Sequence, residues 1–139
     1  MSWGVSGIDG YDPYSALLVS YNGTAVNPEA FSGLTLPVLN STFSTQIDTS
    51  SLPNATLTVV VGHSAPDEGL VLDFGELLFD PTSSALVSSS ALVAGSLSQH
   101  DFSLPNNVNF AGLTGYLQAF AVGGGQITAT NGLKAVLNF

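Results

Sequence analysis

Gly115-Tyr-Leu-Gln-Ala-Phe-Ala-Val122 is an apolar run of strand length, and Gly123-Gly124-Gly125 separates it from a second run that extends from Gln126 to Phe139. Three consecutive glycines accept positive φ without steric cost, so the two runs are predicted to form a β-hairpin. The first run is apolar at nearly every position, which is typical of a strand covered on both faces. In the second run Leu133, Ala135, Leu137 and Phe139 share one face, as in a half-buried strand. A lone hairpin is not stable, so the rest of the chain must cover it.

Composition favours one domain built from strands. The chain has 139 residues, of which 45% are hydrophobic and only 8% charged. This length suits a single core. Ser, Thr, Asn and Gly occupy the polar positions in place of the Glu, Lys and Arg that helical surfaces favour.

Eight further short segments carry strand signals, and turn residues separate them. The expected strands are 16–21, 31–36, 42–48, 55–62, 70–72, 77–79, 85–93 and 96–104. The Ala and Leu residues of 85–93 also suit a helix, but the three serines at 88–90 and Ala94-Gly95 favour a strand. Residues 63–69 are expected to form a loop. Short strands at this spacing predict an all-β fold, an antiparallel β-sandwich of jelly-roll or immunoglobulin-like type, over residues 16–139.

The first fifteen residues are predicted to form an irregular arm. Glycines and an Asp-Pro pair interrupt any regular element there, yet the segment holds Trp3, Tyr11 and Tyr14. Aromatic side chains in such an arm gain burial by lying on a sheet that already exists. We therefore predict an interface formed by Trp3, Tyr11, Tyr14 and the terminal Phe139, with an adjacent subunit favoured over the arm's own sandwich.

The charge balance excludes some partners. One Lys stands against ten acids, which gives a net charge of −9. Nucleic-acid binding needs several cations, so it is excluded, and anionic membrane surfaces are disfavoured. No apolar run is long enough to span a membrane, and the chain has no cysteine. Met1 is not followed by a signal-peptide pattern, so we expect either a protein of the cell interior or virion or one whose leader has been removed.

Four stretches between residues 36 and 139 carry a family resemblance. They are Leu36-Pro-Val-Leu-Asn-Ser-Thr-Phe43, the run from Leu52 to Ser64, Ala94 to Pro105, and Gly115-Tyr-Leu-Gln-Ala-Phe120 with Thr130-Asn-Gly-Leu133. Together they resemble a β-domain that recurs in large secreted and surface proteins of planctomycetes and related bacteria. The chain departs from that family in having Gly123-Gly124-Gly125 where an acid usually follows, and in lacking cysteines. The resemblance implies an extracellular or surface β-sandwich and no catalytic residue.

The residues around His63 give only weak support for a hydrolase-like Ser/His/Asp triad. Ser64, Asp67 and Glu68 follow it closely, but catalytic triads are assembled across a fold, and the chain has no nucleophile elbow. We therefore expect no catalytic residue and no enzyme activity.

Two acidic segments are the candidates for a cation site. Asp9 and Asp12 flank a short turn, and Asp67, Glu68 and Asp73 belong to a second segment that continues through Glu76 and Asp80. Their oxygens suit Ca²⁺, although neither segment matches the EF-hand loop. A structural calcium ion is the only cofactor that the sequence raises.

The nearly uncharged, Ser/Thr-rich surface favours a structural role. Interface cores are depleted in charge, so we expect a non-enzymatic module that self-associates into a homo-oligomer or polymer of an extracellular or surface structure. The alternative is a carbohydrate-binding module in which Trp3, Tyr11, Tyr14 and Tyr21 stack on sugar rings.

Overall fold

The computed structural model describes residues 15–52 and 54–139, so Asp9, Asp12 and the arm residues Trp3, Tyr11 and Tyr14 lie outside the described residues. This part of the chain forms ten strands and one short 3-10 helix, with no α-helix. The bounds are β1 (Leu17–Tyr21), β2 (Phe31–Gly33), β3 (Thr42–Asp48), β4 (Leu57–His63), β5 (Pro66–Leu72), β6 (Gly75–Phe79), β7 (Ala85–Leu92), β8 (Leu97–Ser103), η2 (Val108–Phe110), β9 (Thr114–Gly123) and β10 (Gln126–Val136).

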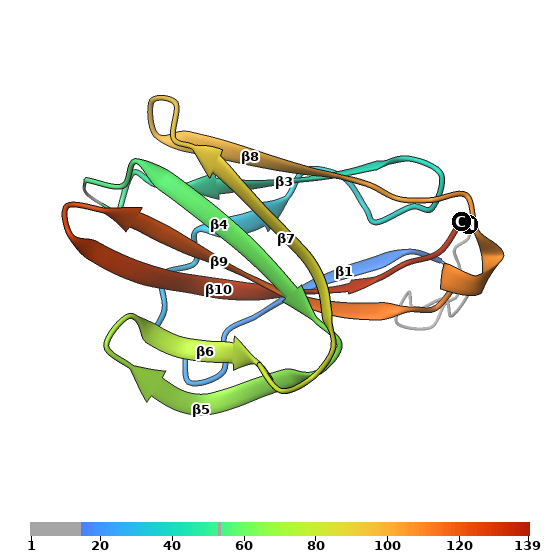
Figure 1. Ribbon diagram of the computed structural model, residues 1–139, viewed down its shortest axis with the longest axis horizontal. Coiled ribbons are helices and arrows are strands. Elements are labelled where there is room, and N and C mark those ends of the chain that lie inside the picture. The colour runs from blue at the N-terminus through green and yellow to red at the C-terminus, as the bar shows by residue number, and fades with distance from the viewer. Residues whose placement is uncertain (1–14, 53) are drawn as a thin grey trace.

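The strands form a β-sandwich with a third, smaller layer. A five-stranded sheet has the order β1-β10-β9-β4-β7, and a three-stranded sheet has the order β2-β3-β8. All pairings between these strands are antiparallel. The predicted hairpin of β9 and β10 is confirmed, with Gly123 opposite Gln126 and Gly124 and Gly125 at positive φ in the turn. Figure 1 shows the two sheets stacked with the β5–β6 hairpin below them.

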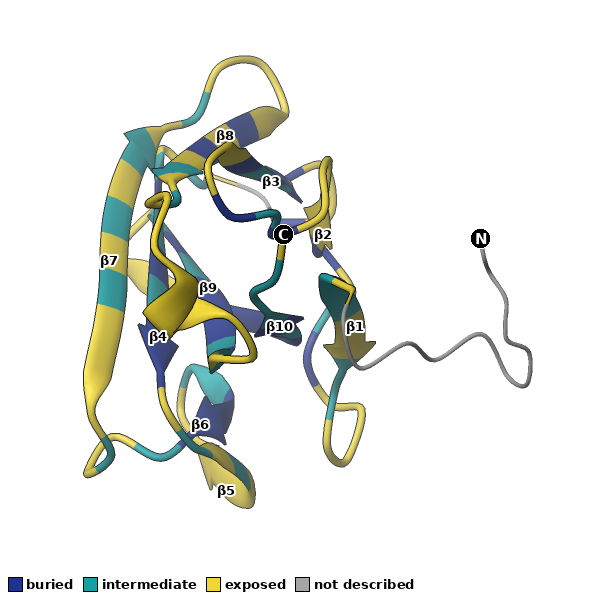
Figure 2. Ribbon diagram, turned by 90° about the vertical axis from the view of Figure 1, so that its right-hand side faces the viewer, coloured by how far each residue is buried: buried dark blue, intermediate teal, exposed yellow. Residues whose placement is uncertain are grey.

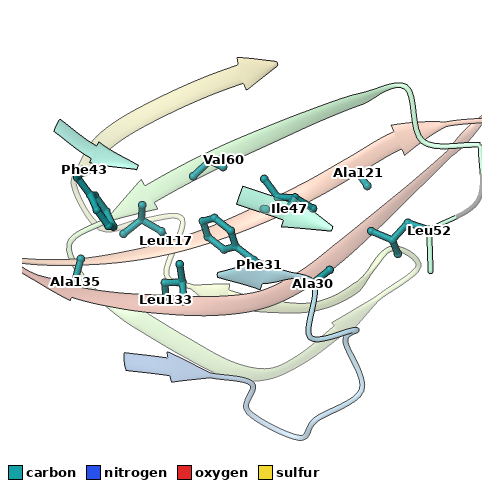
Figure 3. Packing of buried hydrophobic residues seen from close by; sticks show 11 residues of the cluster. Ala30, Phe31, Phe43, Ile47, Leu52, Val60, Leu117, Ala121, Leu133 and Ala135 are labelled. Carbon is teal, nitrogen blue, oxygen red and sulfur yellow. The ribbon is translucent and has the colours of Figure 1, made fainter. Parts of the chain in front are cut away.

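The hydrophobic core lies between the two larger sheets. Alternate residues of β9 and β10, such as Leu117 and Leu133, point inward and meet Phe31, Phe43 and Ile47 from the smaller sheet (Figure 3). Ile47 is fully buried and Leu133 is only 2% exposed. The period-two alternation predicted for the last strand is observed at Leu133 and Ala135, but β10 ends at Val136 and Phe139, predicted on the same face, is 53% exposed. The all-β sandwich is confirmed.

The β5–β6 hairpin covers the outer face of the five-stranded sheet. Phe120, on that outer face of β9, makes edge contacts with Phe74 and Phe79, at ring-centroid distances of 5.7 and 6.3 Å. This cover explains why the first run of the hairpin is apolar on both faces. β5 lies on the far side of β6, at the periphery of the molecule, and most of it is exposed (Figure 2).

A β-bulge interrupts the pairing of β10 with β9. Ala129 pairs with Phe120 and Gly132 pairs with Gln118, so Thr130 and Asn131 together oppose a single residue. The Asn131 amide turns toward β2, where it accepts from the Phe31 N–H at 2.9 Å and donates to the Phe31 carbonyl at 2.8 Å. The bulge therefore joins the two sheets through one side chain.

Two expected boundaries were wrong. Residues 63–69 were expected to be a loop, but His63 ends β4 and β5 begins at Pro66, because this exposed segment pairs with β6 and has no alternation of its own. The strand expected over 31–36 ends at Gly33, since the backbone N–H groups of Leu34 and Thr35 both turn to the Ser44 carbonyl. The other expected strands are observed within one or two residues at most ends.

Candidate functional site

A layer of buried polar side chains joins the outer hairpin to the sheet. We call Asn27, Glu76, Gln118 and Thr130 the polar seam. Gln118 is fully buried; its amide nitrogen donates to the Glu76 and Thr130 carbonyls, both at 2.8 Å, and its oxygen accepts from the Leu78 N–H at 2.9 Å. The Gln118 side chain thus bonds backbone groups of β6 in the way that the backbone of a paired strand would.

Asn27 makes a parallel set of bonds from the loop after β1. Its amide nitrogen donates to the same two carbonyls, those of Glu76 at 2.8 Å and Thr130 at 2.9 Å. Its oxygen accepts from the Glu76 N–H at 2.8 Å. Tyr21 adds a bond from its hydroxyl to the Leu78 carbonyl at 2.7 Å. The end of β1, the loop after it and β9 therefore converge on the backbone of β6.

The Glu76 carboxylate is enclosed by backbone. It accepts from the N–H and hydroxyl of Thr24, at 2.9 and 2.8 Å, and from the Gly69 N–H. Burial alone would raise the pKa of Glu76, but these hydrogen bonds outweigh it and hold the pKa below its ordinary value. A side chain at Gly23, whose φ is +42°, would lie within 2.5 to 2.8 Å of the carboxylate, so glycine is needed for this close approach.

The polar seam leaves none of its side-chain polar atoms without a partner. Each polar atom of the four seam side chains has a hydrogen-bond partner within the protein; across residues 15–52 and 54–139, only Asn22 Oδ1 is buried without one. These hydrogen bonds hold the β5–β6 hairpin in place against the sheet, which gives the seam a structural role.

A second buried polar cluster surrounds His100 between the two larger sheets. The imidazole is 1% exposed, and its two nitrogens each lie 2.8 Å from a hydroxyl oxygen, of Thr58 and Ser89 respectively. Ser98 hydrogen-bonds the Thr58 hydroxyl in turn. Burial lowers the pKa of His100, and the nearby Asp101 carboxylate only partly opposes that effect. A nucleophile–base pair can be drawn from these atoms, but an imidazole with almost no exposed surface gives no place for a substrate.

His63 does not join the serine and acids that follow it. Its Nδ1 lies 3.2 Å from the Ser83 carbonyl oxygen, and its ring stacks on Phe79 at 4.6 Å. The Ser64 hydroxyl accepts from the Ser84 N–H at 3.1 Å. These neighbours place His63 and Ser64 in structural roles beside the outer hairpin.

The acids proposed for a cation site are dispersed. Asp67 and Glu68 lie on β5, with the Asp67 carboxylate accepting from the Glu68 N–H at 2.8 Å, and Asp73 lies in the turn before β6. Among the described residues, no group of three or more His, Asp or Glu side chains is placed to hold a metal ion. Of the second acidic segment, only Glu76 is deeply buried, and its oxygens are occupied by backbone and hydroxyl donors.

Exposed apolar residues concentrate in two places. On β5 three consecutive side chains are open to solvent, with exposed fractions of 45% for Leu70, 56% for Val71 and 41% for Leu72. The second place is the end of the sandwich where the loops before β3 and β9 meet the C-terminus (Figure 1). Phe139 is 53% exposed there, and further exposed apolar side chains are Leu34, Leu36, Val108, Phe110 and Leu113. The predicted interface residue Phe139 is thus accessible.

An apolar cavity opens at the same end of the sandwich. Its volume is about 300 Å³, and every lining residue is apolar or glycine; they include Phe43, Leu86, Phe102, Phe110, Leu113 and Leu117. Sequence patterns did not predict it, because its walls come from strands that are distant along the chain.

No helix of the described chain is long and apolar enough to cross a membrane. Comparison of the chain with protein-family models, with curated proteins and with solved structures gave no match.

Proposed function

We propose that this chain is a non-enzymatic structural module that self-associates through the free edge of β5, as a subunit of an extracellular or surface structure. The observation that carries the proposal is the exposed aliphatic run Leu70 to Leu72 on a strand that pairs only with β6 among the described strands. The family resemblance of residues 36–139 supports the location.

The β5 edge has the features of a strand that adds to another sheet. Its backbone groups on the outer side have no strand partner in the described chain, and unpaired edges act as templates for a further strand. β-Strand addition obtains affinity from backbone hydrogen bonds and specificity from alternate side chains. The exposed Leu70, Val71 and Leu72 would lose part of their contact with water to cross-strand neighbours in such a pairing.

Charge regulates this contact. The edge also carries Asp67, Glu68 and Asp73, within a chain of net charge −9. Like charges that approach across an interface repel, and salt screens them over a Debye length of about 8 Å at physiological ionic strength. Self-association is therefore expected to strengthen as salt concentration rises.

Sedimentation velocity of the full chain tests the proposal, with Val71→Lys as the variant. A lysine on an exposed edge strand discourages pairing, although it reduces the net negative charge. Charge alone would make this variant associate more strongly, so weaker association identifies the edge itself. Leu92→Lys is the matched control, because Leu92 is 77% exposed on β7 and the charge change is identical.

The expected result is concentration-dependent association of the native chain, lost in Val71→Lys and kept in Leu92→Lys. A native chain that remains monomeric at high micromolar concentration, in both low and high salt, would overturn the proposal. Equal association of the two variants would place the interface elsewhere.

A further inference from the structure

We infer that the apolar cavity at the end of the sandwich is the docking site for residues 1–14 of the same chain, with Trp3 as the side chain that fills it. The proposal does not depend on association through β5, and its tests separate the two.

The cavity is suited to one or two apolar side chains. Its volume of about 300 Å³ lies at the lower limit of sites for small molecules, and its lining offers no polar side chain to orient a ligand. Apolar cavities of this kind stay dry and accept apolar groups. An indole ring supplies more apolar area than any other side chain of residues 1–14.

The rim of the cavity is open to solvent. Leu86, Phe110 and Leu113 line it and are 38%, 37% and 40% exposed. Val108, in η2 beside this rim, is 73% exposed. Covering these side chains would remove their apolar surface from water.

The described chain begins beside this rim. Leu17 pairs with Val136, the last residue of β10, and the N–H of the next residue, Leu137, donates to the Leu113 carbonyl at 2.9 Å. The rim at Leu113 is therefore two strand spacings, about 10 Å, from β1. Leu86 on β7 is four spacings away, about 19 Å, since three strands separate β1 from β7.

The fourteen preceding residues are long enough to return to the cavity. Extended chain covers at most about 3.3–3.6 Å per residue, so residues 1–14 span about 46–50 Å when fully extended. A tethered segment also has an effective concentration in the millimolar range. Docking on the same molecule therefore precedes docking on a second copy at ordinary protein concentrations.

Fluorescence gives the first test, because Trp3 is the only tryptophan. In the native full chain we expect emission at shorter wavelength, and weaker quenching by acrylamide, than in the urea-unfolded chain. Phe110→Ser and Leu113→Ser, both at exposed rim positions, should move emission toward the unfolded value. Ile127→Ser should leave it unchanged, since Ile127 is 51% exposed at the opposite end of β10. Native emission equal to that of the unfolded chain, or equal shifts in all three variants, would overturn the inference.

Disulfide trapping gives the second test, which the cysteine-free chain makes clean. Ser2→Cys combined with Val108→Cys should form a disulfide within the monomer. The control pair, Ser2→Cys with Ile127→Cys, should not, although Ile127 is within reach of the arm: nine residues of β10, about 30 Å, separate it from Val136. Disulfide-linked dimers would show that the cavity binds the arm of another copy. A disulfide yield no higher than that of the control pair would show that no arm occupies the cavity. Either result overturns docking on the same chain. Val71→Lys should not change the trapping.

Discussion

Replacement of Gln118 by Met tests the polar seam most directly. Met has a similar volume and an unbranched shape, so the packing between β9 and β6 is retained while the amide is lost. The substitution removes the three hydrogen bonds from Gln118 to the backbone of β6 and β10, which measure 2.8 to 2.9 Å. The structure predicts which of the three backbone partners is left without a hydrogen bond.

The cost follows from those partners. The Glu76 and Thr130 carbonyls keep the Asn27 amide as a donor, at 2.8 and 2.9 Å. The Leu78 N–H loses the Gln118 oxygen while it stays buried, which is the expensive case. At a net value of about 1 kcal/mol for each hydrogen bond, the free energy of unfolding should fall by about 3 kcal/mol.

Urea denaturation followed by circular dichroism measures the change. For a slope of about 2 kcal/mol per molar urea, the midpoint should fall by about 1.5 M. Gln99→Met is the matched control, because Gln99 is exposed on β8 and its amide bonds only the Asp101 carboxylate, at 2.9 Å. We expect the control to change stability by less than about 0.5 kcal/mol. If Gln118→Met changes the free energy of unfolding by no more than the control does, the Gln118 amide does not hold the hairpin in place.

Two further predictions concern the sandwich itself. Because burial lowers the pKa of His100, the imidazole is protonated at higher pH in the unfolded chain than in the folded one. The free energy of unfolding should therefore decline as the pH falls below the ordinary histidine pKa of about 6.5. In urea midpoints measured from pH 7 to pH 5, His100→Gln should make this decline less steep. An unchanged slope would show that another group causes it. A Cβ at Gly123 would collide with the Asn54 carbonyl, whereas one at Gly115 would approach the Leu86 side chain no closer than 3.4 Å, so Gly123→Ala should lower the melting temperature well below that of Gly115→Ala. Equal melting temperatures would contradict the close approach.

The strands were predictable because their signals are local. The three glycines between Val122 and Gln126 fix a turn, and the alternation after it assigns inward and outward faces. The rule needs only neighbouring residues, so it worked for β3, β8 and β10, whereas the strand over 85–93 was favoured only by its serines and the glycine that follows. It failed for β5, where exposed residues on both faces leave no alternation, and the strand exists because β6 supplies a partner.

The layer arrangement was not predictable by the same means. Gln118 is a single polar residue within an apolar strand, which indicates a buried hydrogen-bonding role but does not name its partner. Glu76 belonged to the acidic segment considered for calcium, and its enclosure by Thr24 and Gly69 depends on contacts 52 and 7 residues away. The cavity depends likewise on where distant strands end.

The seam also explains how the hairpin can present a free edge. The contacts among Phe74, Phe79 and Phe120 are apolar and not directional. By themselves they would allow β6 to pack on the outer face of the sheet in several alternative positions along the strand. Side-chain bonds to specific backbone atoms of β6 remove that freedom, because a shift by one residue would leave Gln118 and Asn27 facing the wrong groups. β5 is then held at the periphery by a partner strand that is itself fixed. The pairing proposed for this edge would benefit from such rigidity, since a mobile strand would lose conformational entropy on each contact.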